Sequence, residues 1–85
     1  MKERRLVMAE TKEPITHEIE KHIGILSVND QTGWQKEVNL VSWNDRPAKV
    51  DLRDWSPDHS KLGRGITLTD EEAKTLGRVL EEHFS

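Results

Sequence analysis

Hydrophobic and polar residues alternate in four short runs of this chain, and the spacing becomes helical near the C-terminus. The first run, Ile19–Val28, is rich in Ile, Leu and Val and predicts a strand. Gly24 inside it predicts a bulge or a close backbone approach. Turn-forming residues at 29–33 then lead to a second predicted strand, Trp34–Trp43.

The alternation continues after a second turn. Residues 44–47 (NDRP) predict a hairpin connection, because Pro is favoured where a strand begins. A third strand is predicted over Ala48–Trp55. A loop over Ser56–Gly63 and a short fourth strand over Gly65–Thr67 follow.

A helix is predicted to start at Thr69. Thr69 and Glu72 have the spacing of a capping box, and three acidic residues at 70–72 suit the helix dipole. Gly77 lies beside the apolar stripe and either permits close helix packing across a dimer axis or is incidental. The stripe, with Gly77, is the predicted dimer interface: Ala73, Leu76, Gly77, Leu80 and Phe84.

These elements predict an α+β fold of order β-β-β-β-α, an antiparallel sheet with one helix on one face. The helix stripe is expected to meet Val38, Leu40, Val50 and Leu52. The opposite, open face is expected to show Asn39, Trp43, Lys49, Arg53 and Trp55.

The chain has 85 residues, which predicts one small domain over 15–85, preceded by a flexible polar arm over 1–14. With no Cys and no His pair at metal-ligand spacing, neither disulfides nor a metal are expected to stabilise it. No cofactor is expected either. Oligomerisation is the remaining stabiliser for a core this small, and it predicts a homodimer.

Only 33% of residues are apolar, and no run approaches the roughly 20 residues of a membrane span. We therefore expect no membrane partner and a cytoplasmic, nucleoid-associated location. The formal net charge is -3, and residues 68–85 alone hold two basic and five acidic side chains. The rest of the chain is close to neutral, which leaves room for a basic patch on the sheet.

Enzymatic chemistry has little support in the sequence. There is no Cys and no nucleophile-elbow motif. Asp51 and Asp54 are expected on opposite strand faces, so they form no carboxylate pair. Only Asp58 and His59 support a small hydrolase, and a solvated turn is the better interpretation of both. No activity and no small-molecule substrate are expected.

Nucleic-acid binding has more support, because three Trp residues are many for so small a domain. Bases stack on indole rings for about 1–3 kcal/mol each, and Lys and Arg neutralise phosphates. The alternative for Trp43 and Trp55 is that they cover the sheet edge or fill a dimer seam. Trp34 is expected to pack in the core, with a stacking role at the sheet edge as the alternative. Further cations lie at strand ends or in loops: Lys36, Arg46, Lys61 and Arg64.

The segments DLRDW at 51–55 and GRGITL at 63–68, with the helix that follows, resemble the C-terminal domain of transcriptional positive cofactor four and its small bacterial relatives. The resemblance covers Ile19–Leu80. It implies a homodimer with central helices and curved sheets whose concave faces bind single-stranded DNA. The family's DNA-contacting positions fall on Arg53, Trp55, Arg64, Trp43, and either Arg46 or Lys49. A longer 29–33 loop and the absence of a Lys-rich regulatory arm are departures.

The leading hypothesis is a homodimer that binds single-stranded DNA without sequence preference, and RNA or melted duplex more weakly, in transcription or DNA repair and replication. The alternative is a dimeric protein-interaction module of the transcription machinery, suggested by the acidic helix surface, with incidental nucleic-acid affinity. The candidate DNA-binding residues are Trp43, Lys49, Arg53, Trp55, Arg64, Lys36, Arg46, Lys61, Asn39 and Trp34.

Overall fold

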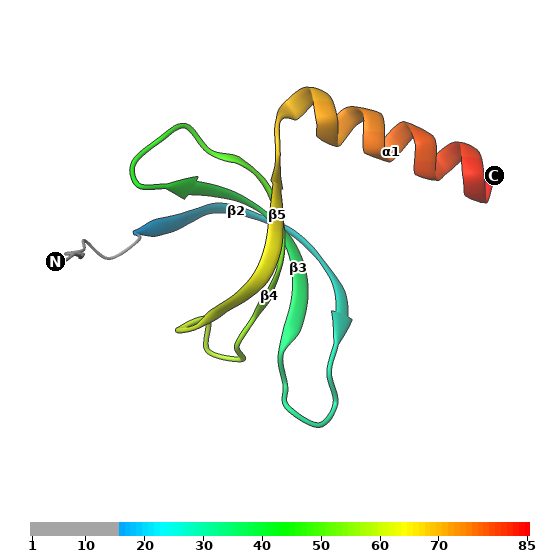
Figure 1. Cartoon of the computed structure of the whole chain (residues 1–85). Coiled ribbons are helices and arrows are strands. Elements are labelled where there is room, and N and C mark those ends of the chain that lie inside the picture. Colours follow the sequence, from blue (N-terminus) through cyan, green and yellow to red (C-terminus); the bar gives the residue numbers. More distant parts are fainter. Residues whose placement is uncertain (1–15) are drawn as a thin grey trace, which may run out of the picture.

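The computed structural model describes residues 16–85 and confirms the predicted order of four strands followed by one helix (Figure 1). The strands form one antiparallel sheet in which each strand pairs with its neighbour in sequence. The predicted arm at 1–14 lies outside the described residues. The elements are β2 His17–Val28, β3 Gln35–Trp43, β4 Lys49–Trp55, β5 Leu62–Leu68 and α1 Asp70–Phe84.

The pairing of β3 with β4 separates the sheet into two chemically different faces. Asn39 lies opposite Asp51 on one face, whereas Val38 lies opposite Leu52 on the other. The predicted alternation of these strands is therefore confirmed. We call the first the inner face, with Glu37, Asn39, Val41, Trp43, Lys49, Asp51, Arg53 and Trp55, and the second the outer face, with Lys36, Val38, Leu40, Val50, Leu52 and Asp54.

The sheet curls around its inner face. The His17 ring at the start of β2 lies 5.7 Å from the Trp43 ring and 5.2 Å from the Trp55 ring, although those two residues end different strands. Three register irregularities in β2 accompany this bend, one of them between His22 and Gly24. The bulge predicted near Gly24 is confirmed. No close backbone approach accompanies it within residues 16–85, because a Cβ at this position would meet nothing within 4 Å.

The curl puts the buried core of the protomer on the inner face. Val41 and Trp55 are both 0% exposed there, beside buried polar side chains. The outer residues expected to form the core under the helix are only half-buried. The expectation of a core between the helix and the outer face is thus wrong for the protomer. The strong curvature of the sheet brings the inner-face side chains together, so that they bury one another.

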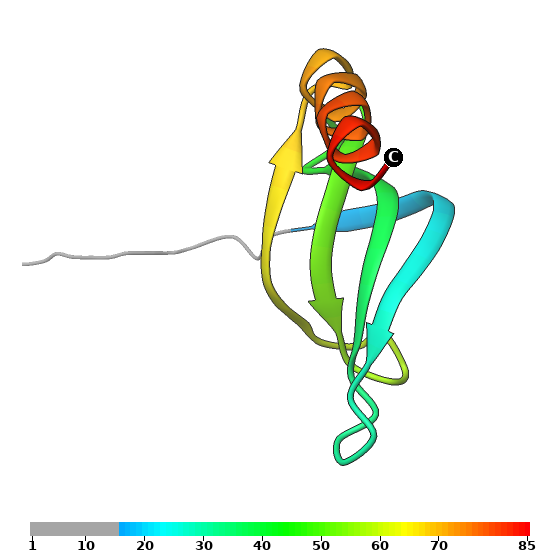
Figure 2. The ribbon, with the colours of Figure 1, turned by 90° about the vertical axis from the view of Figure 1, so that its right-hand side faces the viewer.

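The helix begins as predicted and leaves the sheet rather than covering it. Glu72 N donates to Thr69 Oγ1 over 3.1 Å, and Thr69 N donates to Glu72 Oε1 over 2.9 Å, which completes the capping box. Within the described chain, α1 contacts only β4 and β5 among the elements. Figure 1 and Figure 2 place it beyond the end of the sheet. A single residue, Thr69, separates β5 from α1, so the chain has no loop with which to fold the helix back.

The connections explain where the strands begin and end. Asn44 and Asp45 both have positive φ, 53° and 64°, and Arg46 N donates to Trp43 O over 3.0 Å. These features define a tight turn at Asn44–Asp45 within the hairpin connection predicted over 44–47, and β4 begins at Lys49. The fourth strand is longer than predicted because Leu62 already pairs with Trp55.

Candidate nucleic-acid interface

Arg53 lies at the centre of the inner face, on β4, with three of its side-chain nitrogens bonded to the protein. Nε and Nη2 donate to the two carboxylate oxygens of Asp51, each over 2.9 Å. Nη1 donates to Gly63 O over 2.9 Å. This forked pairing is the strong, geometrically specific form of an Arg–carboxylate contact. The Arg53 side chain is only 14% exposed.

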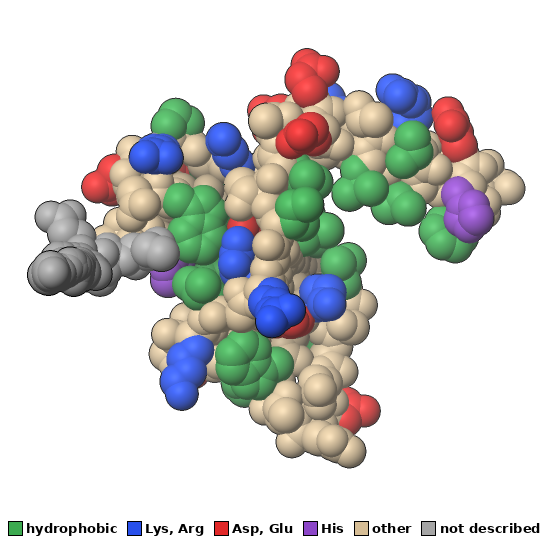
Figure 3. Space-filling model, in the orientation of Figure 1, with side chains coloured by type: hydrophobic (Ala, Val, Ile, Leu, Met, Phe, Trp, Pro, Cys, Tyr) green, Lys and Arg blue, Asp and Glu red, His purple; other side chains and the backbone are tan. Residues whose placement is uncertain are grey.

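The indole of Trp43 lies against the same guanidinium. Arg53 Cζ is 4.8 Å from the Trp43 ring centroid, which is a cation–π contact. Trp43 is half-buried, and it lines an open hollow with Arg53, Leu62 and Thr67. On the face shown in Figure 3, Lys and Arg side chains lie between apolar patches over the strands, and acidic side chains gather over the start of the helix. The hollow offers a ring surface bordered by polar groups.

Trp55 shares the inner face with Trp43, as predicted, but its ring is not open. The residue is 0% exposed, and its ring lies between those of His17 and His59, at 5.2 and 5.5 Å. Its indole N–H has no hydrogen-bond partner within the described residues. The expectation that Trp55 is free to stack on a base is therefore wrong for this conformation. The curvature of the sheet makes it a core side chain.

Asn39 is also buried rather than open, within a polar cluster centred on Glu37. Asn39 Nδ2 donates to Glu37 Oε1 over 3.1 Å, and His22 Nδ1 donates to Asn39 Oδ1 over 2.7 Å. Gln35 Nε2 and His59 Nε2 donate to Glu37 Oε2 over 3.0 and 2.9 Å. Glu37 is 1% exposed, so these donors replace the water that the carboxylate has lost. The sequence pattern does not reveal this cluster, because its His residues come from distant segments of the chain.

The loop between β4 and β5 holds His59 over this cluster. His59 has a positive φ of 62°, and its N–H donates to Ser56 O over 2.9 Å. The Asp58 carboxylate accepts from Ser60 N, Ser60 Oγ and Ser56 Oγ at 2.7 to 3.0 Å. These bonds, those from Ser60 first, lower the pKa of Asp58 to about 2. The solvated-turn interpretation holds for Asp58, whereas His59 is a half-buried structural side chain.

The remaining predicted cations are exposed but do not share one surface. Lys49 belongs to the inner face, opposite Val41, whereas Lys36 belongs to the outer face, opposite Asp54. The rest lie at the sheet's edges and turns: Arg46 in the β3–β4 turn, Lys61 before β5 and Arg64 on β5. Within residues 16–85 no ion pair engages any of these five.

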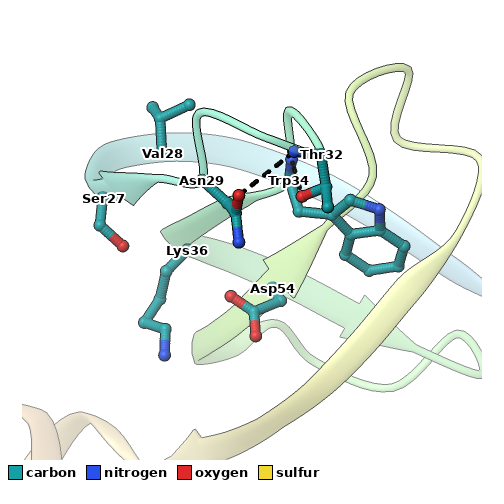
Figure 4. Close-up of a pocket in the computed structure, with 7 residues that line it drawn as sticks. All are labelled: Ser27, Val28, Asn29, Thr32, Trp34, Lys36 and Asp54. Carbon is teal, nitrogen blue, oxygen red and sulfur yellow. Dashed lines mark hydrogen bonds between the residues drawn. The ribbon is translucent and has the colours of Figure 1, made fainter.

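Trp34 lies at the β2–β3 hairpin (Figure 4). It precedes β3, whereas Trp43 ends that strand. Trp34 is half-buried, and a Cβ at Gly63 would come within 3.2 Å of its Cζ3, so the ring packs against β5. It lines one open hollow with Lys36 and Asp54, and another with residues of the β4–β5 loop that include Lys61. Its packing is therefore partial, and an edge of the ring remains accessible.

The helix stripe is exposed in the protomer. No residue of α1 is buried, and Leu80 and Phe84 are 47% and 78% exposed. Ala73 and Leu76 are half-buried, near the end of β5. A Cβ at Gly77 would meet nothing within 4 Å, so packing inside the protomer does not require this glycine.

Residues 16–85 contain neither a candidate membrane-spanning helix nor a candidate metal site. The one helix there is neither long enough nor apolar enough to cross a membrane. The same residues contain no group of three or more His, Asp or Glu side chains arranged to hold a metal ion.

Comparison with known protein families matches the same segments, 51–55 and 63–68, on which the resemblance rests. The family model described as Transcriptional Coactivator p15 (PC4) matches residues 31–78, from the β2–β3 turn into the helix. The chain is also 45% identical over 64 residues to an uncharacterized protein of Treponema pallidum (strain Nichols). That alignment covers 75% of this chain and 74% of the relative.

Proposed function

Because the chain belongs to the Transcriptional Coactivator p15 (PC4) family of nucleic-acid-binding domains, we propose that it binds single-stranded DNA as a homodimer, without sequence preference. The observation that carries the proposal is the Trp43 ring held against Arg53 at the border of an open hollow. An unpaired base can stack on such a ring, whereas a base within a duplex cannot reach it. Duplex DNA is therefore a poor ligand, and RNA or melted duplex binds more weakly than single-stranded DNA.

Phosphate contacts are assigned to exposed cations of the sheet and its turns. Lys49 lies on the inner face, and Arg64 and Arg46 lie on the adjoining edge strand and turn. Trp34 and Lys61 share a second hollow, which gives a longer strand a further place to bind. No base-edge recognition is proposed, so the binding is independent of sequence.

A second copy of the chain is the proposed cover for the helix stripe. Leu80, Phe84 and Ile66 on β5 are 47–78% exposed, which is more apolar surface than α1 can bury against its own sheet. Two antiparallel helices packed through Leu76, Gly77 and Leu80 would bury these side chains and provide the stabilisation that so small a core needs.

The proposed role is non-catalytic support of transcription or DNA repair and replication in the bacterial cytoplasm, at the nucleoid. The protein-interaction alternative uses the acidic helix surface and needs no hollow at Trp43. The two are distinguished by titrating labelled oligo-dT, the matching duplex and oligo-U into the protein at low salt and following anisotropy. Saturable binding with oligo-dT tightest supports the proposal. No binding to any of the three contradicts it and favours a protein partner.

The salt dependence of that titration measures the phosphate share. For single strands, the logarithm of the association constant falls linearly with the logarithm of salt concentration, by about 0.7 per phosphate contacted. Binding that is insensitive to salt would remove the cations from the proposed interface.

A further inference from the structure

Arg53 is the cation nearest the proposed stacking ring, and its guanidinium is already engaged by the protein. Nε and Nη2 form the fork to Asp51, and Nη1 donates to Gly63 O, all over 2.9 Å. A DNA phosphate would have to displace one of these partners, and breaking the fork would leave a carboxylate that is 0% exposed without its cation.

Asp51 is fixed in turn by β5. Thr67 Oγ1 donates to Asp51 Oδ2 over 3.2 Å, so neighbours on two strands hold the carboxylate. Gly65, opposite Arg53, leaves room for the arginine stem, because a Cβ there would overlap the Arg53 side chain and the Leu52 carbonyl. The guanidinium is therefore fixed in position, with its Cζ 4.8 Å from the Trp43 ring centroid.

We propose that Asp51 and Arg53 are positioning residues, which hold the Trp43 ring for stacking, and that Arg53 is not a phosphate ligand. The inference rests on the proposed function, because the ring matters only if a base stacks on it. Arg53, which the sequence pattern predicted to neutralise DNA phosphates, thereby takes a positioning role. Phosphate neutralisation then falls to exposed cations such as Lys49.

Two substitutions separate the roles. Arg53→Lys keeps the positive charge but loses the fork to Asp51 and the planar guanidinium surface. If Arg53 binds phosphate, this variant should largely keep its affinity for oligo-dT. If Arg53 positions Trp43, the affinity should fall. Asp51→Asn would release Arg53 and remove a negative charge beside the site, so a phosphate-binding Arg53 predicts tighter binding. The positioning role predicts weaker binding instead. Lys49→Ala is the matched control for loss of a true phosphate contact.

The experiment is a titration of labelled oligo-dT at several salt concentrations for the wild type and the three variants, each first checked for a cooperative unfolding transition. We expect Arg53→Lys and Asp51→Asn to weaken binding on the order of tenfold with the salt slope unchanged. Lys49→Ala should reduce the slope by about 0.7. If Arg53→Lys binds oligo-dT as tightly as the wild type, or if Asp51→Asn binds more tightly, the inference is wrong.

A ligand-free measurement keeps this test independent of DNA binding. In a Trp34→Phe background, acrylamide quenching of Trp fluorescence reports chiefly on Trp43, because Trp55 is buried. Arg53→Lys should increase quenching, since the Trp43 ring loses its contact with the guanidinium. Unchanged quenching would overturn the inference even if Asp51→Asn fails to fold. Failure of the wild type to bind oligo-dT would instead contradict the proposed function.

Discussion

The imidazole of His59 reaches the carboxylate of Glu37 across the inner face, with 2.9 Å between Nε2 and Oε2. The contact closes the β4–β5 loop over the sheet and places the His59 ring 5.5 Å from that of Trp55. A hydrogen bond between residues distant in sequence thus holds His59 over Trp55, the largest fully buried side chain among residues 16–85.

Removal of the His59 imidazole is expected to destabilise the fold. His59→Ala takes one donor from the buried Glu37 carboxylate and uncovers the Trp55 ring, at a cost of about 1–3 kcal/mol in the free energy of unfolding. Urea denaturation followed by circular dichroism measures the loss. His83→Ala, on the exposed last turn of α1, is the control and should change the midpoint little. Equal midpoints for the two variants would contradict the role given to His59.

Asp58 predicts a dependence of stability on acid pH. Its pKa is lowered from 3.8 to about 2 in the folded chain, so its stabilising contribution is complete above pH 3.8 and is lost as the pH falls towards 2. Asp58→Asn should therefore be less stable than the wild type at pH 6, and the difference should shrink as the pH approaches 2. Urea midpoints across this range measure it.

The control for that series is Asp30→Asn, an exposed residue in the β2–β3 turn, which should leave the midpoint unchanged at pH 6. A wild-type advantage over Asp58→Asn that stayed constant down to pH 2 would show that the carboxylate is not held as described.

Two glycines are expected to respond to alanine in opposite ways. A Cβ at Gly65 would overlap Arg53 and the Leu52 carbonyl, so Gly65→Ala should cost about 1–3 kcal/mol. A Cβ at Gly24 would meet nothing within 4 Å, and Gly24→Ala should be neutral or stabilise by a few tenths to about 1 kcal/mol. Thermal unfolding of the pair measures both. A Gly65→Ala variant as stable as Gly24→Ala would refute the close crossing of β4 and β5.

Leu80 predicts the oligomeric state. It is 47% exposed in the protomer, and Leu80→Asp would place a charge in the proposed helix–helix contact. We expect sedimentation equilibrium to give twice the chain mass for the wild type and the chain mass for this variant. Thr75→Asp introduces the same charge on the polar side of α1 and should leave the dimer intact. A monomeric wild type would remove the homodimer from the account.

The sequence predicted the elements and their faces because those depend on local rules. Alternation in β3 and β4 correctly paired Trp43 with the Arg53 face, and the Thr69 capping box located the start of the helix. The Asn44–Asp45 turn likewise follows from residue preferences at positive φ. Each of these features is determined within a few residues of chain.

What the sequence could not predict is the curvature of the sheet, which depends on contacts between distant residues. Because β2 bends at three irregularities, Trp55 and Asn39 are buried where an open face was expected. The same curl joins His22 and His59 to Glu37. Alternation assigns a side chain to a face, but it cannot tell whether that face is flat and open or closed on itself.

Stacking of an unpaired base on Trp43 is tested by comparing Trp43→Ala and Trp43→Phe with the wild type in an oligo-dT anisotropy titration. We predict a loss of about 1–3 kcal/mol in binding free energy for Trp43→Ala, recovered in large part by Trp43→Phe, which retains an aromatic face. Equal affinity of all three proteins for oligo-dT would contradict this stacking.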